Sequence, residues 1–170
     1  MSQIKVKIFD LTNSQRFVWL VSLSGSLLIM PLFHNQMITG PLVNAVFFIA
    51  LYFLGLRDVL LLAFLPSLVA LSAGTLPAAL SPMIPYIIIS NAVLIFVFGF
   101  LRQKNFWLGV FAASFLKFGF LYTSIFYLIN LFSDKQLPQG AAAMMSWPQF
   151  YSALAGGVIA FIFLKSIKRI

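Results

Sequence analysis

Long runs of apolar residues, separated by short polar connections, make up most of this chain. A helix needs about 20 predominantly apolar residues to cross the hydrocarbon core of a membrane. Six runs approach or reach that length, and we predict one transmembrane helix for each: residues 17–33, 41–56, 59–76, 82–101, 106–132 and 147–164. The pattern therefore predicts an all-α integral membrane protein, a compact bundle of six transmembrane helices that forms one domain over residues 1–170.

Composition supports the membrane class. The 170 residues are 62% hydrophobic and only 8% charged, whereas soluble domains carry about 25% charged residues. The net charge of +8 comes from basic residues that flank the apolar runs. We therefore connect this charge with membrane orientation and anionic headgroups, and we expect no nucleic-acid partner.

The distribution of basic residues predicts the orientation. Cytoplasmic connections of membrane proteins are enriched in Lys and Arg. With both termini in the cytoplasm, the outer side receives only Lys135, and nine basic residues lie inside: Lys5, Lys7, Arg16, Arg57, Arg102, Lys104, Lys165, Lys168 and Arg169. The first residues lack the cleavage pattern of a signal peptide, so we expect the first span to be retained, after a short segment along the cytoplasmic interface. The protein is predicted to be a multi-pass protein of the cell membrane.

One charge departs from this distribution, because Lys117 lies near the middle of the run 106–132. An ammonium at the bilayer centre costs at least about 2.5–3.5 kcal/mol. The three acidic residues, Asp10, Asp58 and Asp134, belong to membrane edges or connections. Two interpretations stay open: Lys117 bonds to helix carbonyls or to an amide such as Asn91, or it faces a polar cavity.

Helical spacing divides the fifth predicted span into two faces. Lys117 shares one face with Gly109, Ala113 and Ser124, and Ser114 lies beside it one turn earlier. Small residues allow close helix approach in membranes. The opposite side carries bulky residues that suit lipid or packing: Phe111, Phe115, Phe118 and Phe126. The spacing therefore predicts that Lys117 points into the bundle.

Polar residues gather in the predicted outer half of the bundle, around Lys117. We take seven residues as candidates for substrate binding: Lys117, His34, Asn35, Gln36, Asn91, Trp147 and Gln149. Two of them have simpler interpretations. Trp147 can belong to an aromatic interface belt, and His34 can be an interfacial residue. The coincidence of these side chains on one side predicts an outward-facing binding cavity.

Pairs of small residues predict helix contacts in two other spans. In the sixth span, Ser152 with Gly156 and Ala153 with Gly157 form overlapping pairs that suit packing within the chain. In the first span, Ser22 and Ser26 are four residues apart. They can pack within the chain or contact another membrane subunit.

Several segments resemble the substrate-binding S component of energy-coupling factor (ECF) transporters, from a less characterised branch. They are GPLVNAVFFIALYFLGLRD, LPAALSPMIPYIIISN, ASFLKFGFLY and MMSWPQFYSALAGG. The resemblance implies cargo binding near the outer face by the first loop and the later helices. It also implies two kinds of partner, a transmembrane coupling subunit and a pair of cytoplasmic ATPases. In the family an alanine pair on the first helix meets the coupling subunit, and Ser22 and Ser26 have that spacing here.

The expected function is therefore substrate capture for ATP-driven uptake of a vitamin- or cofactor-like small molecule, which an anionic group would suit. The chain has no GxxxxGK[ST] loop, so ATPases would be separate subunits. An enzyme is not expected, because there is no Cys or Glu and only one His. We also expect no cofactor and no metal site. A self-sufficient carrier or channel stays open as the alternative, and a membrane-embedded enzyme is less favoured.

Overall fold

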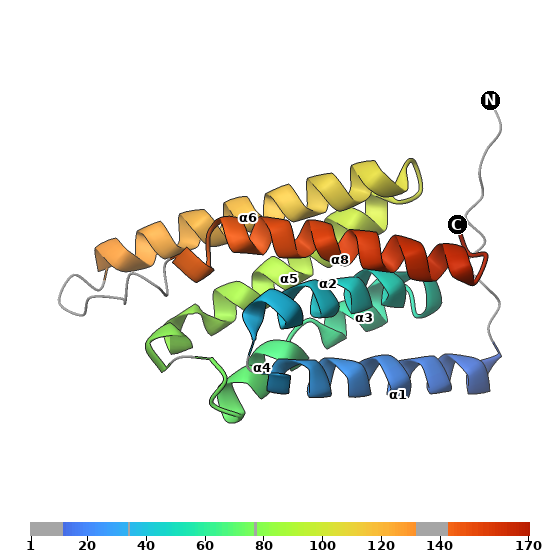
Figure 1. Cartoon of the computed structure of the whole chain (residues 1–170), viewed down its shortest axis with the longest axis horizontal. Coiled ribbons are helices and arrows are strands. Elements are labelled where there is room, and N and C mark those ends of the chain that lie inside the picture. Colours follow the sequence, from blue (N-terminus) through green and yellow to red (C-terminus); the bar gives the residue numbers. More distant parts are fainter. Residues whose placement is uncertain (1–11, 34, 77, 132–142) are drawn as a thin grey trace.

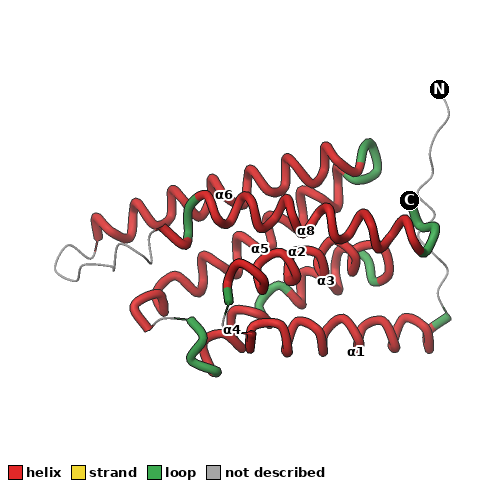
Figure 2. The backbone as a smooth tube through the Cα atoms, viewed as in Figure 1, coloured by secondary structure: helices red, strands yellow, loops and turns green. Residues whose placement is uncertain are grey.

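The computed structural model describes residues 12–33, 35–76, 78–131 and 143–170, and all regular elements in them are helices (Figures 1 and 2). The longer helices are α1 (Asn13–Ile29), α2 (Gln36–Phe53), α5 (Ile84–Leu101), α6 (Phe106–Leu131) and α8 (Trp147–Ser166). The short ones are η1 (Met30–Phe33), α3 (Leu56–Leu62), α4 (Leu65–Ser72) and η2 (Ala78–Met83). The prediction of an all-helical fold is confirmed for these residues.

Within the described residues, five helical segments are long and apolar enough to cross a membrane: Asn13–Phe33, Gln36–Phe53, Ser81–Leu101, Phe106–Tyr127 and Trp147–Ser166. They correspond to five of the six predicted spans. Such a set of helices is the mark of a multi-pass membrane protein. The second begins earlier than predicted, because the Asn35 side chain accepts the Met37 N–H at 3.0 Å and caps the helix there.

The prediction of one continuous helix over 59–76 is wrong. This segment consists of α3 and α4, of 7 and 8 residues. Pro66 has no N–H for the carbonyl of Leu62, which interrupts the helical hydrogen bonds. The Asn91 side chain donates to the Ala63 carbonyl at the break, at 3.2 Å. Irregular backbone at membrane depth is tolerated where protein covers it, and Ala63 and Pro66 are both buried.

Helix α2 is the centre of the bundle. Every residue from Val43 to Leu51 is buried, and α2 packs most extensively against α8 and also contacts α1 and α5. Helix α6 packs against α5 and α8. Figure 1 shows α1 along one edge of the bundle and α6 along the opposite edge. The contacts α2–α8, α8–α6, α6–α5 and α5–α2 thus connect these four helices in a ring. Polar residues on their inner faces can therefore meet.

Two adjacent glycines of α8 allow this close packing. A Cβ at Gly156 would lie 2.7 Å from Asn44 Cβ and 2.7 Å from the Pro41 carbonyl oxygen, both on α2. A Cβ at Gly157 would overlap Val110 on α6. The expected packing role of the small residues in this helix is thus confirmed, and one of these contacts lies directly beside Asn44.

The start of α1 and the end of α8 lie at the same end of the bundle (Figure 1). The ion pair between Arg16 and Asp58, with 2.6 Å between Nη2 and Oδ2, joins α1 to α3 at this end. The opposite end holds the turns between η1 and α2 and between α4 and η2, and the start of α8. The expected interfacial segment before the first span and the outer Lys135 lie outside the described residues.

Candidate functional site

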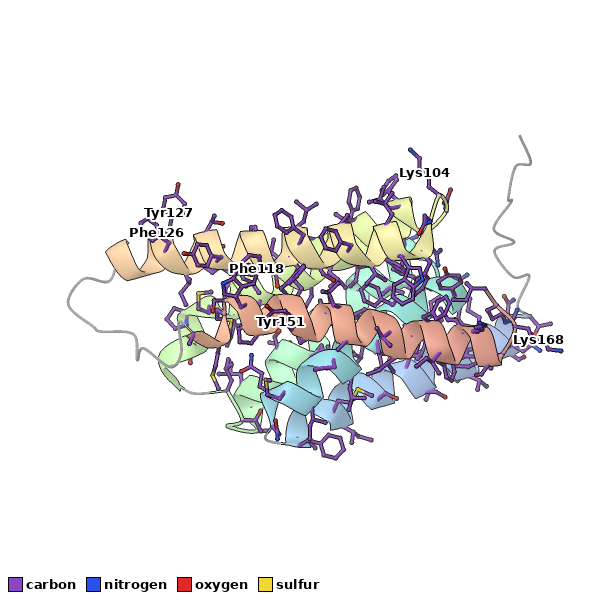
Figure 3. The ribbon with its side chains drawn as sticks, turned by 45° about the horizontal axis from the view of Figure 1, so that its top comes forward. Lys104, Phe118, Phe126, Tyr127, Tyr151 and Lys168 are labelled. Atoms are coloured by element: carbon purple, nitrogen blue, oxygen red, sulfur yellow. The ribbon has the colours of Figure 1, made fainter. Side chains whose placement is uncertain are left out.

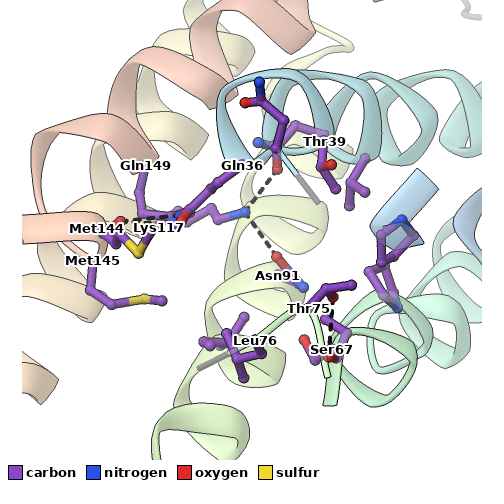
Figure 4. Close-up of a pocket in the computed structure, with 18 residues that line it drawn as sticks. Gln36, Thr39, Ser67, Thr75, Leu76, Asn91, Lys117, Met144, Met145 and Gln149 are labelled. Carbon is purple, nitrogen blue, oxygen red and sulfur yellow. Dashed lines mark hydrogen bonds between the residues drawn. The ribbon is translucent and has the colours of Figure 1, made fainter. Parts of the chain in front are cut away.

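A cavity of about 190 Å³ lies between the helices, near the end of the bundle opposite to the start of α1 (Figure 4). Its walls come from η1, α2, α4, α5, α6, the start of α8 and the segments that follow α4 and precede α8. The lining residues are Pro31, Asn35, Gln36, Thr39, Gly40, Val43, Asn44, Pro66, Ser67, Ala70, Thr75, Leu76, Ile87, Asn91, Lys117, Met144, Met145 and Gln149. It thus combines elements from most of the chain.

The Lys117 side chain is at the centre of the polar part of this cavity. Its Nζ donates to Asn44 Oδ1 and to Asn91 Oδ1, each at 2.8 Å (Figure 4). The three residues come from α6, α2 and α5, and each is at most 3% exposed. Both interpretations of Lys117 apply at the same time, since its amino group bonds to Asn91 and also lines a cavity.

The two amide groups are themselves positioned by the helices around them. Asn91 Nδ2 donates to the Ala63 carbonyl at 3.2 Å, and Asn44 Nδ2 faces Ser152 Oγ at 3.5 Å. Ser152 Oγ in turn donates to the Gln149 carbonyl at 3.0 Å. Each side-chain nitrogen is therefore directed away from Lys117, and each amide oxygen is directed toward it.

The charge of Lys117 has no carboxylate partner in the described part of the chain. Asp58 is the one acidic residue described, and it pairs with Arg16 at the other end of the bundle. An ammonium has three N–H donors, and the described acceptors of Lys117 are the two amide oxygens. Amide oxygens solvate a cation without neutralising it. In its protonated form, Lys117 therefore has a charge and one N–H available to a ligand in the cavity.

The rim of the cavity contains two glutamines that share one acceptor. Gln36 Nε2 and Gln149 Nε2 both donate to the Met144 carbonyl, at 3.3 and 3.2 Å. The structure thus brings five of the seven candidate residues to one cavity: Asn35, Gln36, Asn91, Lys117 and Gln149. Their role in binding stays a prediction. The Asn35 side chain also has a structural role as the cap of α2.

Trp147 does not line this cavity. It is 56% exposed and stacks on Phe118, with ring centroids 4.9 Å apart. It also stacks on Tyr151, and Phe118 and Tyr151 lie on α6 and α8 in Figure 3. This arrangement on the outer surface is typical of an interface belt. His34 lies outside the described residues.

The predicted faces of α6 are mostly confirmed. Gly109, Ala113 and Ser124 are buried with Lys117, and Phe111, Phe115 and Phe126 are exposed. Phe118 is only partly exposed because it stacks on Trp147. Ser114 is buried, but its Oγ donates to the Val110 carbonyl of its own helix at 2.7 Å. It therefore satisfies its hydroxyl within α6.

Sequence reasoning missed Asn44, although it is the only amide in the apolar run from Pro41 to Phe53. A lone amide in a membrane helix is costly without a partner, so this residue carried a signal comparable to that of Asn91. Ser67, Thr39 and Thr75 also line the cavity. Hydroxyl residues are common in apolar helices, where they bond to their own backbone, and they gave no distinctive pattern.

Ser22 and Ser26 lie on α1, away from the cavity. Ser26 Oγ donates to the Ser22 carbonyl at 2.9 Å, and Ser22 is exposed. A Cβ on the intervening Gly25 would meet no atom of the described chain within 4 Å. The inner face of α1 is instead formed by Leu23 and Leu27, which are buried. The described part of the chain therefore leaves the small-residue face accessible to lipid or to another subunit.

Comparisons of this chain with protein-family models, with curated proteins and with solved structures find no match. In the described residues, no three His, Cys, Asp or Glu side chains gather as a metal site would require. The function is therefore inferred from the cavity itself.

Proposed function

We propose that this chain is the substrate-capture subunit of an ECF-type, ATP-driven uptake transporter, and that it binds a small anionic molecule in an outward-facing cavity. The observation that carries the proposal is the buried Lys117, held by two amide oxygens on a cavity wall and far from the described carboxylate. A buried charge of this kind is costly. A cargo that supplies the opposite charge gives it a function.

The proposal includes a topology of six crossings with both termini in the cytoplasm. The third crossing is made by α3 and α4 together, and their break contacts Asn91 beside the cavity. Lys104 and Lys168 lie at the end of the bundle where α8 ends (Figure 3), which supports a cytoplasmic position for that end. The cavity at the opposite end then faces outward.

Labelling of introduced cysteines tests this topology, since the chain has no native Cys. In right-side-out vesicles, an impermeant maleimide should label Asn35→Cys and should leave Ser166→Cys unlabelled until the membrane is opened. The reverse pattern would overturn the proposed orientation.

Small molecules that co-purify with the protein provide the test of cargo capture. Untargeted mass spectrometry of detergent-solubilised protein should find an anionic molecule with the wild-type chain and with Lys104→Met, an exposed-lysine control. Lys117→Met should lose it, because hydrogen bonds to charged groups contribute about 1.5–3 kcal/mol, which is more than tenfold in affinity. Equal retention by Lys117→Met, with a lower melting temperature, would mean that Lys117 is only structural.

The proposed membrane partner is a coupling subunit that contacts the open face of α1 around Ser22 and Ser26, with separate ATPases supplying energy. Ser22→Trp combined with Ser26→Trp should abolish co-purification with that subunit and leave cargo binding intact. Ile162→Trp, on an exposed position of α8, is the matched control. If the double variant still co-purifies with the coupling subunit, the contact surface lies elsewhere on the chain. Uptake by the reconstituted chain alone would instead favour a self-sufficient carrier.

A further inference from the structure

The cavity also carries information about the kind of cargo it accepts. Resting on the proposed function, we infer that its ligand is a small monocarboxylate whose apolar body is about the size of a single six-membered ring. Three properties of the cavity support this class: its volume, its single described cation, and the chemistry of its walls.

Volume limits the size of the ligand. A protein cavity of about 150 Å³ is known to accept benzene. The present cavity, of about 190 Å³, has room for one such ring and a small substituent. A molecule with two linked or fused rings exceeds this volume, so it would have to extend beyond the rim or displace wall residues such as Val43 and Ile87 of α2 and α5.

The polar groups of the cavity fit one negative charge. Lys117 is the only cation among the lining residues that the structure describes, and two of its three N–H groups are already accepted by Asn44 and Asn91. A phosphate monoester carries about −1.5 to −2 charges and three strong acceptor oxygens. A single ammonium balances only part of this charge, whereas a carboxylate carries a single charge and fewer acceptor sites.

Apart from Asn35, Gln36 and Gln149 at the rim and the Ser67 hydroxyl, the remaining walls are largely apolar. Pro31, Val43, Leu76, Ile87 and Met145 contribute only carbon and sulfur through their side chains. Two of the hydroxyl groups on the walls already donate to backbone carbonyls, Thr39 to Met30 at 3.2 Å and Thr75 to Ala70 at 3.1 Å. Such walls favour a hydrocarbon ring over a sugar or a nucleotide, which need many hydrogen bonds.

Burial predicts the orientation of the ligand. Lys117, Asn44 and Asn91 are buried, whereas Asn35 and Met144 at the rim are exposed. The carboxylate therefore binds Lys117 at the closed part of the cavity, and the ring extends toward Met144, Gln36 and Gln149 (Figure 4). Contact with the flexible methionine side chain accommodates rings of different shape.

The test measures binding of defined probes to the purified, ligand-depleted full chain by calorimetry. Benzoate and cyclohexanecarboxylate are compared with their uncharged amides, benzamide and cyclohexanecarboxamide, and also with phenyl phosphate and biphenyl-4-carboxylate. The two small acids should bind at least about tenfold more tightly than their amides and than the two other anions. Lys117→Met should remove the preference for acid over amide, and Lys104→Met should retain it.

A variant that changes the volume of the cavity tests the size limit without altering Lys117. Ile87→Ala enlarges the cavity and should raise the relative affinity for biphenyl-4-carboxylate. Equal binding of acids and amides to the wild-type chain would overturn the inferred class, as would a preference for phenyl phosphate. If no small acid binds, but another molecule co-purifies and is lost in Lys117→Met, the monocarboxylate class is wrong and the proposed function stands. If no probe binds and nothing co-purifies, both are wrong.

Discussion

The two ends of the bundle treat a positive charge in different ways. At the end where α1 starts and α8 ends, Arg16 lies 2.6 Å from Asp58, and both side chains are accessible, at 51% and 25%. Near the other end, Lys117 is buried and is held by two neutral amides. The first cation is neutralised by its own chain and hydrated. The second is solvated by the protein without being neutralised in the described residues, so of these two sites only the one at Lys117 leaves a charge for a ligand to balance.

The two arrangements also differ in energy. An exposed ion pair contributes about 0.2–1 kcal/mol, because water and salt screen it. A buried hydrogen bond to a charged group contributes about 1.5–3 kcal/mol, and the loss of one partner leaves a costly polar atom behind. Substitutions around Lys117 should therefore have much larger effects than substitutions at the Arg16–Asp58 pair.

The largest effect is expected for Asn91→Leu. This change removes one acceptor of Lys117 and leaves the Ala63 carbonyl at the helix break without its side-chain donor. Together these losses should reduce the free energy of unfolding by about 3 kcal/mol or more. Chemical denaturation in detergent measures this effect, with Gln103→Leu in the exposed turn as the control.

A double variant sharpens this result. In Lys117→Met with Asn91→Leu, the unpaired charge is gone, so part of the lost stability should return. Simple addition of the two single effects would mean that the charge and the amide are energetically independent, contrary to their 2.8 Å hydrogen bond.

The next effect concerns the helix contact that positions Asn44. Gly156→Ala places a methyl group against Asn44 Cβ and the α2 backbone, which should cost about 1–3 kcal/mol and weaken cargo binding. Gly119→Ala, where a Cβ meets no described atom within 4 Å, should be neutral or stabilise by about 0.5–1 kcal/mol. Melting temperatures of both variants provide the comparison. Equal destabilisation by both would contradict a specific α2–α8 contact.

A smaller effect is expected at the aromatic surface outside the cavity. Trp147→Ala removes the stacking on Phe118 and should cost about 0.5–1.5 kcal/mol of stability beyond the loss of buried area. Cargo affinity should stay unchanged, whereas Gln149→Leu, two residues further and on the cavity rim, should lower it. A reduced cargo affinity of Trp147→Ala would mean that Trp147 does contribute to binding.

The smallest effect is expected for Asp58→Asn, at the exposed pair. The loss should be about 0.2–1 kcal/mol in low salt and should shrink as ionic strength rises. Thermal unfolding at two salt concentrations measures it, with Lys104→Gln as a control for a lysine in a turn. A loss as large as that of Asn91→Leu would remove the distinction between the two ends.

Much of the local structure could be predicted from the sequence. The apolar runs correspond to the long helices, and spacing within the run 106–132 correctly placed Lys117 on the buried face of α6 and Phe111 on the exposed face. These features depend on backbone hydrogen bonds between near neighbours and on the helical repeat. The break at Pro66 also has a local cause in the sequence. The apolar residues on both sides of this proline nevertheless led to the prediction of one continuous helix.

The partners of Lys117 depended on the tertiary structure. Asn44 and Asn91 are 73 and 26 residues away in the chain, and no repeat or spacing relates them. Their approach depends on how α2, α5, α6 and α8 cross, which is set by contacts such as Gly156 against Asn44. The same crossing leaves Trp147 outside the cavity and the small-residue face of α1 uncovered. By itself the sequence determined the helices, their membrane character and the presence of an unusual buried lysine. Only packing between distant segments decided what that lysine contacts, because side-chain positions across a bundle follow from helix crossing and not from local periodicity.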